Sequence, residues 1–350
     1  MAKATFADTM LNDQNLERAV SYLRTTAYNP DLRMCREAPT VAPNVYWVAS
    51  DNLLAYKALE PYDSELASTI KTRLIEIART YNLPTSSEGL PLSLRYDVIM
   101  RDNEKLQIPP KNVTHITLYN GSYLLRYDIA NGTGQPEDWR EYADLLLLVA
   151  LSNHNQGEHA NAVGNFTLAT KMWDGLGLRD KAYDLPYGEG QASGSDHAYA
   201  TYKLGLLLYV SAKLAIDLSF RNDVVNKIWS MQNQTSGGIY THILPDGSRG
   251  VSDTNTETTA FIILGVSGAQ SKFSTWTMSD RNVQAFIIIS ATLVAFVVTL
   301  YAVRRRGWLS LRFGERTKVW YQECMNLDKD LLRHWWLKWV SSSSNSSPQC

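Results

Sequence analysis

The sequence predicts a mainly α-helical protein: an array of helical hairpins with a β-hairpin insertion, followed by one transmembrane helix and a short cytoplasmic amphipathic helix. Three observations support this fold class. Apolar residues recur at helical spacing through most of residues 1–270. The pattern changes to alternation of apolar and polar residues within residues 91–130. Residues 283–303 form an uncharged, mostly apolar run that is long enough to cross a bilayer.

Helical spacing dominates the first part of the chain. A helix is predicted over residues 13–27, where Leu16 and Leu23 lie on the same face. After a proline-bearing loop, residues 44–84 have the pattern of a helix-loop-helix, because Pro61 separates two helical runs. These two runs are expected to pack side by side as an antiparallel pair.

The alternating segment predicts a β element inserted between helices. Polar and apolar residues alternate from Leu92 to Val98, which favours a strand. Further on, Asn120-Gly121 stands between two strand-like runs, and this dipeptide is a strong short-range signal for a hairpin turn. We therefore expect a β insertion over about residues 91–130.

Helical spacing returns after Glu137. Two helices are predicted on either side of Gly157, a third over about residues 196–216 and a fourth over residues 221–233. A last apolar helix is expected from about Thr256. Short connections between successive helices predict antiparallel pairs with longer loops at one end of the array.

The apolar run over residues 283–303 sets the predicted topology. Three arginines follow it directly, whereas few basic residues precede it, so the positive-inside rule places the C-terminal side in the cytoplasm. The first 20 residues contain no apolar export signal; an incomplete start, unaided insertion and the reverse orientation all remain open, and the first is preferred. The expected parts are an outer domain at residues 1–270, a juxtamembrane linker at 271–282, the span at 283–303 and a cytoplasmic tail at 304–350.

The tail contains a second membrane signal. Residues 318–340 combine four tryptophans with leucines and basic residues, a mixture typical of a helix that lies on the inner membrane surface. A helix that binds a partner protein explains the same pattern equally well.

Five N-x-S/T sequons precede the span, which mildly favours a glycosylated outer domain. Asn120 is expected to be a turn residue first and a glycan acceptor second. The candidate glycosylation sites are Asn112, Asn120, Asn131, Asn165 and Asn233.

Composition excludes several classes of function. The net charge of −1 argues against a nucleic-acid partner. No phosphate-binding loop, HExxH, paired CxxC or GxSxG motif is present, so no cofactor is expected. His154 and His159 are five residues apart, too far around one helix to share a face, and no metal site is expected.

Cys35 is the only cysteine before the span, so the outer domain has no internal disulfide. The oligomeric state is left open.

Three short patterns resemble the α/α-toroid group, the six-hairpin glycosidase-like folds. The first is the aromatic and Asp-Asn turn at residues 46–52, and the second closes a helix at residues 171–175. The third is the Gly-Gly-aromatic loop at residues 232–241 with the polar cluster at 255–260. The resemblance covers about residues 12–268, although only about four hairpins can be counted where a closed ring has six.

The resemblance implies a cavity that binds carbohydrate. Aromatic rings pack on the apolar faces of sugar rings, and carboxylates and amides pair with hydroxyls. Hydrolysis of a glycosidic bond needs two carboxyl groups, for which Asp51 and Glu257 are the predicted pair and Asp174 the reserve. The expected substrate-binding residues are Trp47, Asn52, Trp173, Tyr240 and Asn255.

Structural roles compete with each of these assignments. Asp51 can cap the helix that follows it, and Glu257 can complement the dipole of its own helix. Trp47 and Trp173 can be core residues. The alternative function is therefore a non-catalytic surface scaffold that binds a protein, and the presence of both carboxyl groups in one water-accessible cleft would separate the two readings.

Overall fold

The computed structural model describes residues 6–101, 113–130, 137–184, 197–250 and 253–268, with side chains from residue 14 onward. The predicted linker, span and tail, together with Asn112 and Asn131, lie outside these residues. No helix in the described ranges has both the length and the apolar character needed to span a bilayer.

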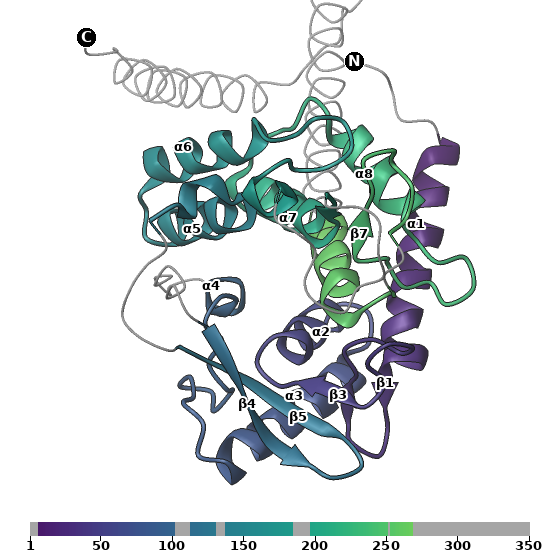
Figure 1. Ribbon diagram of the computed structural model, residues 1–350, viewed down its shortest axis with the longest axis vertical. Helices are drawn as coiled ribbons and strands as arrows, with labels where there is room; N and C mark the ends of the chain where they lie inside the picture. The colour runs from purple at the N-terminus through teal and green to yellow at the C-terminus, as the bar shows by residue number, and fades with distance from the viewer. Residues whose placement is uncertain (1–5, 102–112, 131–136, 185–196, 251–252, 269–350) are drawn as a thin grey trace, which may run out of the picture. The chain divides into compact units, whose positions relative to one another are not determined.

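The described part of the chain is mainly α-helical, as predicted (Figure 1). A further helix follows the labelled ones over residues 256–268. The labelled helices are α1 (Phe6–Ser21), α2 (Asp51–Leu59), α3 (Ser64–Thr80), α4 (Asp97–Met100), α5 (Ala143–Asn155), α6 (His159–Thr170), α7 (Tyr202–Leu214) and α8 (Arg221–Ser230), with short helical turns η1 (Tyr22–Ala27), η2 (Trp139–Glu141) and η3 (Lys181–Asp184).

Consecutive helices pack in pairs, α2 with α3, α5 with α6 and α7 with α8. Gly157 joins α5 to α6 with φ +78°, a left-handed conformation that glycine adopts without steric cost. In Figure 1, α5, α6 and α7 occupy the upper part of this domain, and the helix over residues 256–268 (light green) runs between them and the strands below.

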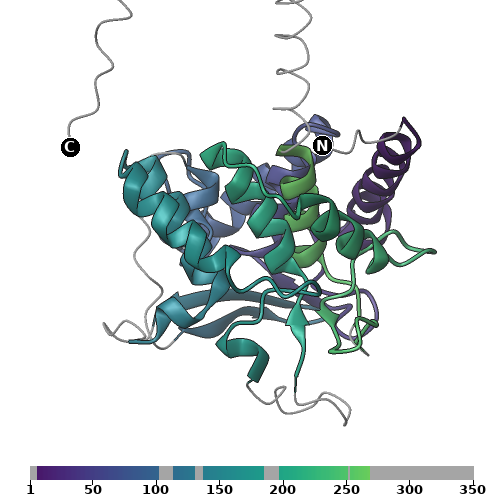
Figure 2. The ribbon, with the colours of Figure 1, turned by 90° about the horizontal axis from the view of Figure 1, so that it is seen from above.

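The β insertion forms a hairpin, although its boundaries differ from those expected. Strands β4 (Val113–Asn120) and β5 (Leu124–Ala130) pair antiparallel with three residues between them. A short strand, β3 (Val45–Trp47), adds to β5 in parallel and gives the order β3-β5-β4. Seen from above, the hairpin strands run along one side of the helices (Figure 2). The shorter strands are β1 (Tyr28–Asn29), β2 (Met34–Cys35), β6 (Tyr199–Ala200) and β7 (His242–Ile243).

The strand predicted over residues 92–98 is wrong. The chain forms a loop there that leads into α4, because its polar side chains bond to nearby backbone groups. Ser93 Oγ accepts a hydrogen bond from Tyr96 N at 3.1 Å, and Asp97 Oδ1 accepts one from Ser93 N at 2.9 Å. In this turn Tyr96 and Val98 are buried, so the alternation of polar and apolar residues does not indicate a strand.

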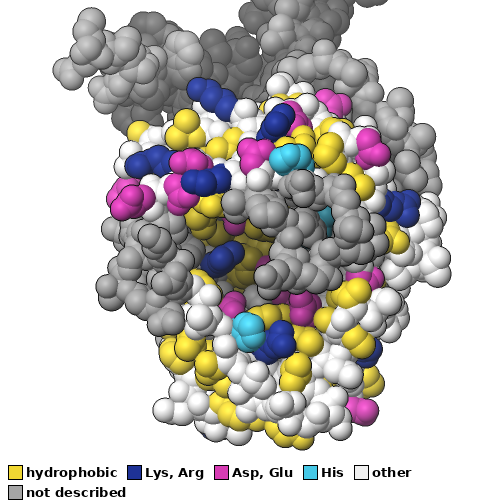
Figure 3. Space-filling view, in the orientation of Figure 1, with side chains coloured by type: hydrophobic (Ala, Val, Ile, Leu, Met, Phe, Trp, Pro, Cys, Tyr) yellow, Lys and Arg dark blue, Asp and Glu magenta, His cyan; other side chains and the backbone are white. Residues whose placement is uncertain are grey.

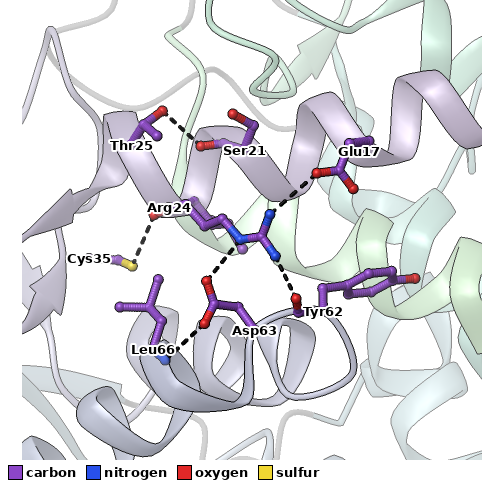
Figure 4. Close-up of polar contacts among 9 residues, drawn as sticks. Glu17, Ser21, Arg24, Thr25, Cys35, Tyr62, Asp63 and Leu66 are labelled. Atoms are coloured by element: carbon purple, nitrogen blue, oxygen red, sulfur yellow. Dashed lines mark hydrogen bonds and ion pairs between the residues drawn. The ribbon is translucent and has the colours of Figure 1, made fainter.

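The N-terminal helix is fastened to α3 by one arginine (Figure 4). Arg24 Nε lies 3.0 Å from Asp63 Oδ2, and the same guanidinium donates to the carbonyl oxygen of Tyr62 at 2.5 Å. Asp63 Oδ1 accepts a hydrogen bond from Leu66 N at 3.0 Å and so caps α3. Asp63 therefore both caps α3 and binds Arg24 of η1, the turn that continues α1.

Two glycines allow α7 to approach the helix over residues 256–268 closely. A Cβ atom on Gly205 would lie 2.6 Å from the carbonyl oxygen of Phe261, and one on Gly265 would lie 2.2 Å from the carbonyl oxygen of Gly205. Both distances are too short for carbon and oxygen, so only glycine fits at this crossing. The contact fixes the helix whose first turn carries Glu257.

Candidate functional site

A pocket of about 330 Å³ lies where α2, the edge of the sheet, the loop before α4 and the start of the helix over residues 256–268 meet. The face drawn in Figure 3 is hollowed at its centre, and acidic and basic side chains lie in and beside the hollow. Four of the residues predicted from sequence line the pocket: Trp47, Asp51, Asn255 and Glu257.

Asp51 is the first residue of α2 and is only 4% exposed. Its Oδ1 accepts a hydrogen bond from Ser50 Oγ at 3.2 Å, while its buried Oδ2 has no hydrogen-bond partner among the described residues. Burial raises the pKa of Asp51 well above its ordinary value, and the charges of Glu257 and Glu37 raise it further. Burial therefore favours the protonated form of this carboxyl group, which lines the pocket.

Asn52 fixes the backbone that presents Asp51. Its Oδ1 accepts a hydrogen bond from Cys35 N at 2.7 Å, and its Nδ2 donates to the carbonyl oxygens of Cys35 and Trp47 at 3.0 and 2.7 Å. With its amide fully used, this buried side chain holds the first turn of α2 against β2 and β3 and does not line the pocket.

Glu257 is the second residue of its helix, and Tyr96 Oη donates a hydrogen bond to its Oε1 at 2.6 Å. Burial raises the pKa of Glu257, while the Tyr96 hydrogen bond and the charge of Arg95 oppose the rise. Among the described residues, no cation stabilises the charged form of Asp51 and no tyrosine donates a hydrogen bond to it. A proton shared by the two carboxyl groups is therefore favoured on Asp51.

The cap of this last helix is Asn255, whose Oδ1 accepts a hydrogen bond from Thr258 N at 2.8 Å. Thr256 ties the same turn to the segment that carries Glu37: its backbone N donates to the carbonyl oxygen of Glu37 at 3.0 Å, and its Oγ1 donates to that of Arg36 at 2.6 Å. Asn255, and not Glu257, is therefore the N-cap of the helix over residues 256–268.

Trp47 forms one wall of the pocket on β3. Its Nε1 donates to Glu37 Oε2 at 3.0 Å. The ring meets the His115 ring edge-on at a centroid distance of 5.3 Å, and the guanidinium of Arg126 lies 5.6 Å from its centre. Asp128, two residues further along β5, also lines the pocket.

A buried charge network lies behind the pocket. Lys203 pairs with Asp180 and lies 3.7 Å from Asp144, and all three side chains are nearly inaccessible to solvent. Burial alone would raise the pKa of Asp144, but the charges of Lys203 and then Arg95 outweigh it and hold the pKa below its ordinary value. Tyr202 Oη also donates to Asp144 Oδ2 at 2.8 Å. The network connects α5 and α7 to the Arg95 side of the pocket.

The pattern at residues 171–175 does not reach the pocket. Trp173 stacks on Phe220 with ring centroids 5.4 Å apart. Asp174 Oδ1 accepts hydrogen bonds from the backbone N of Leu176 at 3.0 Å and of Gly177 at 3.2 Å, and its Oδ2 accepts one from Tyr199 Oη. The structure therefore gives both residues packing or turn contacts, away from Asp51 and Glu257.

Tyr240 and Asn233 form a separate turn. Asn233 Oδ1 accepts hydrogen bonds from the backbone N of Thr235 at 2.8 Å and of Ser236 at 3.0 Å, and its Nδ2 donates to Tyr240 Oη at 2.8 Å. Arg249 covers the Tyr240 ring at 5.2 Å. A glycan on Asn233 would be attached to the nitrogen that donates to Tyr240, whereas Asn120 is exposed at the end of β4 and Asn165 is half-buried on α6.

His154 and His159 lie closer together than expected from a single helix. The turn at Gly157 places them on two helices with ring centroids 5.4 Å apart. Within the ranges that the structure describes, no group of three His, Cys, Asp or Glu side chains is arranged to hold a metal ion.

Sequence reasoning did not identify the other residues that line the pocket, and the four that carry a charge or a phenol group are Glu37, Arg95, Tyr96 and Asp128. Asp128 alternates with buried residues along a strand, so its face was readable once the register was known. The other three come from loops whose placement depends on distant segments. No protein-family model matches the chain, and no curated protein matches it.

Proposed function

We propose that the pocket binds a saccharide and that Asp51 and Glu257 hydrolyse a glycosidic bond within it, on a domain of α/α-toroid type. The observation that carries this proposal is the unpartnered Asp51 Oδ2, which is buried in the wall of a cavity that Glu257 also lines. Burying a polar group without a partner is costly, and such groups recur at functional sites.

The two carboxyl groups have different environments, which suits different roles. Asp51, protonated through burial, is the general acid that donates its proton to the oxygen of the leaving sugar. Glu257, whose carboxylate Tyr96 and Arg95 favour, accepts a proton from water or attacks the anomeric carbon. When the surroundings of two carboxyl groups give them different pKa values, one can act as the acid and the other as the base in the same site.

The remaining lining residues suit a sugar ring. Trp47 provides an aromatic wall, and Asn255, Glu37 and Ser93 place polar groups around the same cavity. In this proposal the span over residues 283–303 tethers the domain to a membrane, on its outer side.

The test is turnover of a panel of oligosaccharides, measured as newly formed reducing ends. Asp51→Asn and Glu257→Gln should each lower kcat by about 10³-fold or more, because each removes a group that acts in the transition state. Asp174→Asn is the matched control, since Asp174 lies in a separate turn and its loss should leave kcat unchanged.

Three outcomes separate the alternatives. Loss of activity in both pocket variants and not in the control supports hydrolysis. Saccharide binding by the wild-type protein without turnover would leave a carbohydrate-binding domain. Neither binding nor turnover across the panel would refute the proposal and leave the non-catalytic scaffold.

A further inference from the structure

The pocket carries an excess of negative charge. Glu37, Asp128 and Glu257 contribute carboxylates, and Arg95 is the single cation among the described residues that line it. Burial raises the pKa of Asp51 well above its ordinary value and so disfavours a negative charge on this carboxyl group.

The charge of Arg95 is shared among several carboxyl groups. It acts on Asp144 behind the pocket and on Glu257 and Asp128 at the pocket itself. Asp144 also lies beside Lys203, which pairs with Asp180. One cation shared in this way does not balance all the carboxyl groups that line the pocket.

Asp128 is the clearest case. Among the described residues, no hydrogen bond contributes to the pKa of Asp128. The charges of Arg95 and His115 stabilise its ionised form, although burial has the larger and opposite effect and raises its pKa. Arg126, the other nearby cation, is stacked on Trp47 and is not among the lining residues. A cation that enters the pocket thus finds a free carboxylate.

A metal ion does not fit this arrangement, since no three ligands among the described residues are placed around one point. An organic cation that carries its charge on a single ammonium group can be bound by only one or two carboxylates. We propose, resting on the proposed function, that the saccharide taken by this pocket carries a free, protonated amino group: an amino sugar whose ammonium pairs with Asp128 and Glu37.

The chemistry distinguishes this ligand from its neutral relatives. An ammonium donates charge-assisted hydrogen bonds to carboxylates, whereas a hydroxyl at the same ring position donates one neutral bond. N-Acetylation removes the charge and adds bulk. Attraction to exposed carboxylates is screened by salt, so the preference should weaken as ionic strength rises.

The experiment compares glucosamine hexamers with glucose hexamers of the same linkage by isothermal titration calorimetry. The purified full-length chain is titrated at about pH 6, where most carboxylates are ionised and the sugar amine is protonated. Glucosamine hexamers should bind about 10-fold more tightly or better, and N-acetylated hexamers should lose this advantage.

Variants assign the preference to the pocket. Asp128→Asn should reduce the preference by about 10-fold while leaving the affinity for glucose hexamers nearly unchanged. Glu37→Gln should also reduce the preference by about 10-fold, measured as the ratio of the two affinities. Glu88→Gln is the charge-matched control, because Glu88 pairs with Lys71 on another surface of the domain. It should retain the full preference.

Binding of neutral hexamers as tight as that of amino hexamers would overturn the inference and leave the proposed function standing. Preference that persists in both pocket variants, or falls equally in Glu88→Gln, would mark general surface attraction and also overturn it. Failure of all three hexamers to bind would instead refute the proposed function itself.

Discussion

Asp51→Asn should remove activity and at the same time stabilise the fold near neutral pH. The pKa of Asp51 is raised in the folded state by burial and by Glu257, whereas in the unfolded chain it returns to about its ordinary value of 3.8. Between these two pKa values the folded state binds more protons than the unfolded state. The free energy of unfolding must therefore fall as pH rises through this window.

The size of the effect follows from proton linkage. One group contributes at most about 1.4 kcal/mol for each pH unit inside the window. Asparagine has nearly the shape of the protonated acid and does not ionise, so the variant loses this slope. It should be less sensitive to pH and more stable than wild type above the window.

The assay is urea unfolding of wild type and variant at one-unit steps from about pH 4 to pH 8. Asp144→Asn is the matched control with the opposite sign, because Lys203 and Arg95 lower the pKa of Asp144 against the effect of burial. Its charge stabilises the fold above about pH 4, and that contribution disappears as pH falls through the lowered pKa. The Asp144 variant should thus be less stable than wild type at pH 7.

One result would refute the reasoning about Asp51. If Asp51→Asn were less stable than wild type at pH 7 and kept the same slope, Asp51 would be an ionised residue with unrecognised partners. It could not then be the general acid.

Three further predictions concern the framework around the pocket. Lys203→Met should cost about 3 to 5 kcal/mol, because it leaves the buried Asp180 without a cation; a loss under 1 kcal/mol in urea titrations would contradict a buried ion pair. Gly205→Ala should cost about 1 to 3 kcal/mol or more by driving two helices apart, whereas Gly164→Ala, in open space on α6, should be neutral or stabilising in thermal melts. Asp63→Ala should cost about 1 kcal/mol through the lost cap of α3 and, in addition, free the N-terminal helix, which faster amide exchange there would reveal.

The sequence by itself determined the helical pairs and the hairpin. Apolar residues that recur with the helical period indicate the buried face of a helix, whatever the rest of the chain does. Gly157 indicates where the chain reverses between α5 and α6. The Asn120-Gly121 signal likewise depends only on local backbone preference, and it located the reversal, although Asn120 itself ends β4 and the turn consists of residues 121–123. These are short-range properties, and they can be read from short windows.

The parallel pairing of β3 and the loop at residues 92–98 required the tertiary structure. Parallel strands are joined by long connections, so no local pattern names the partner of β3. Alternation over residues 92–98 has the period of a strand, but Ser93 and Asp97 bond to nearby backbone and form a turn. Side chains such as these compete with a neighbouring strand for hydrogen bonds to the same backbone groups. Which of the two wins depends on whether a neighbouring strand is present in the folded chain.

The same division holds for the site. The resemblance to the toroid folds singled out Asp51 and Glu257 at the start of apolar helices, with Asp174, at the end of a helix, in reserve. Tyr199 and two backbone amides occupy the Asp174 carboxylate. A carboxyl group becomes available for chemistry only if remote segments leave it unpaired, and which segments reach it is decided by the packing of the whole chain.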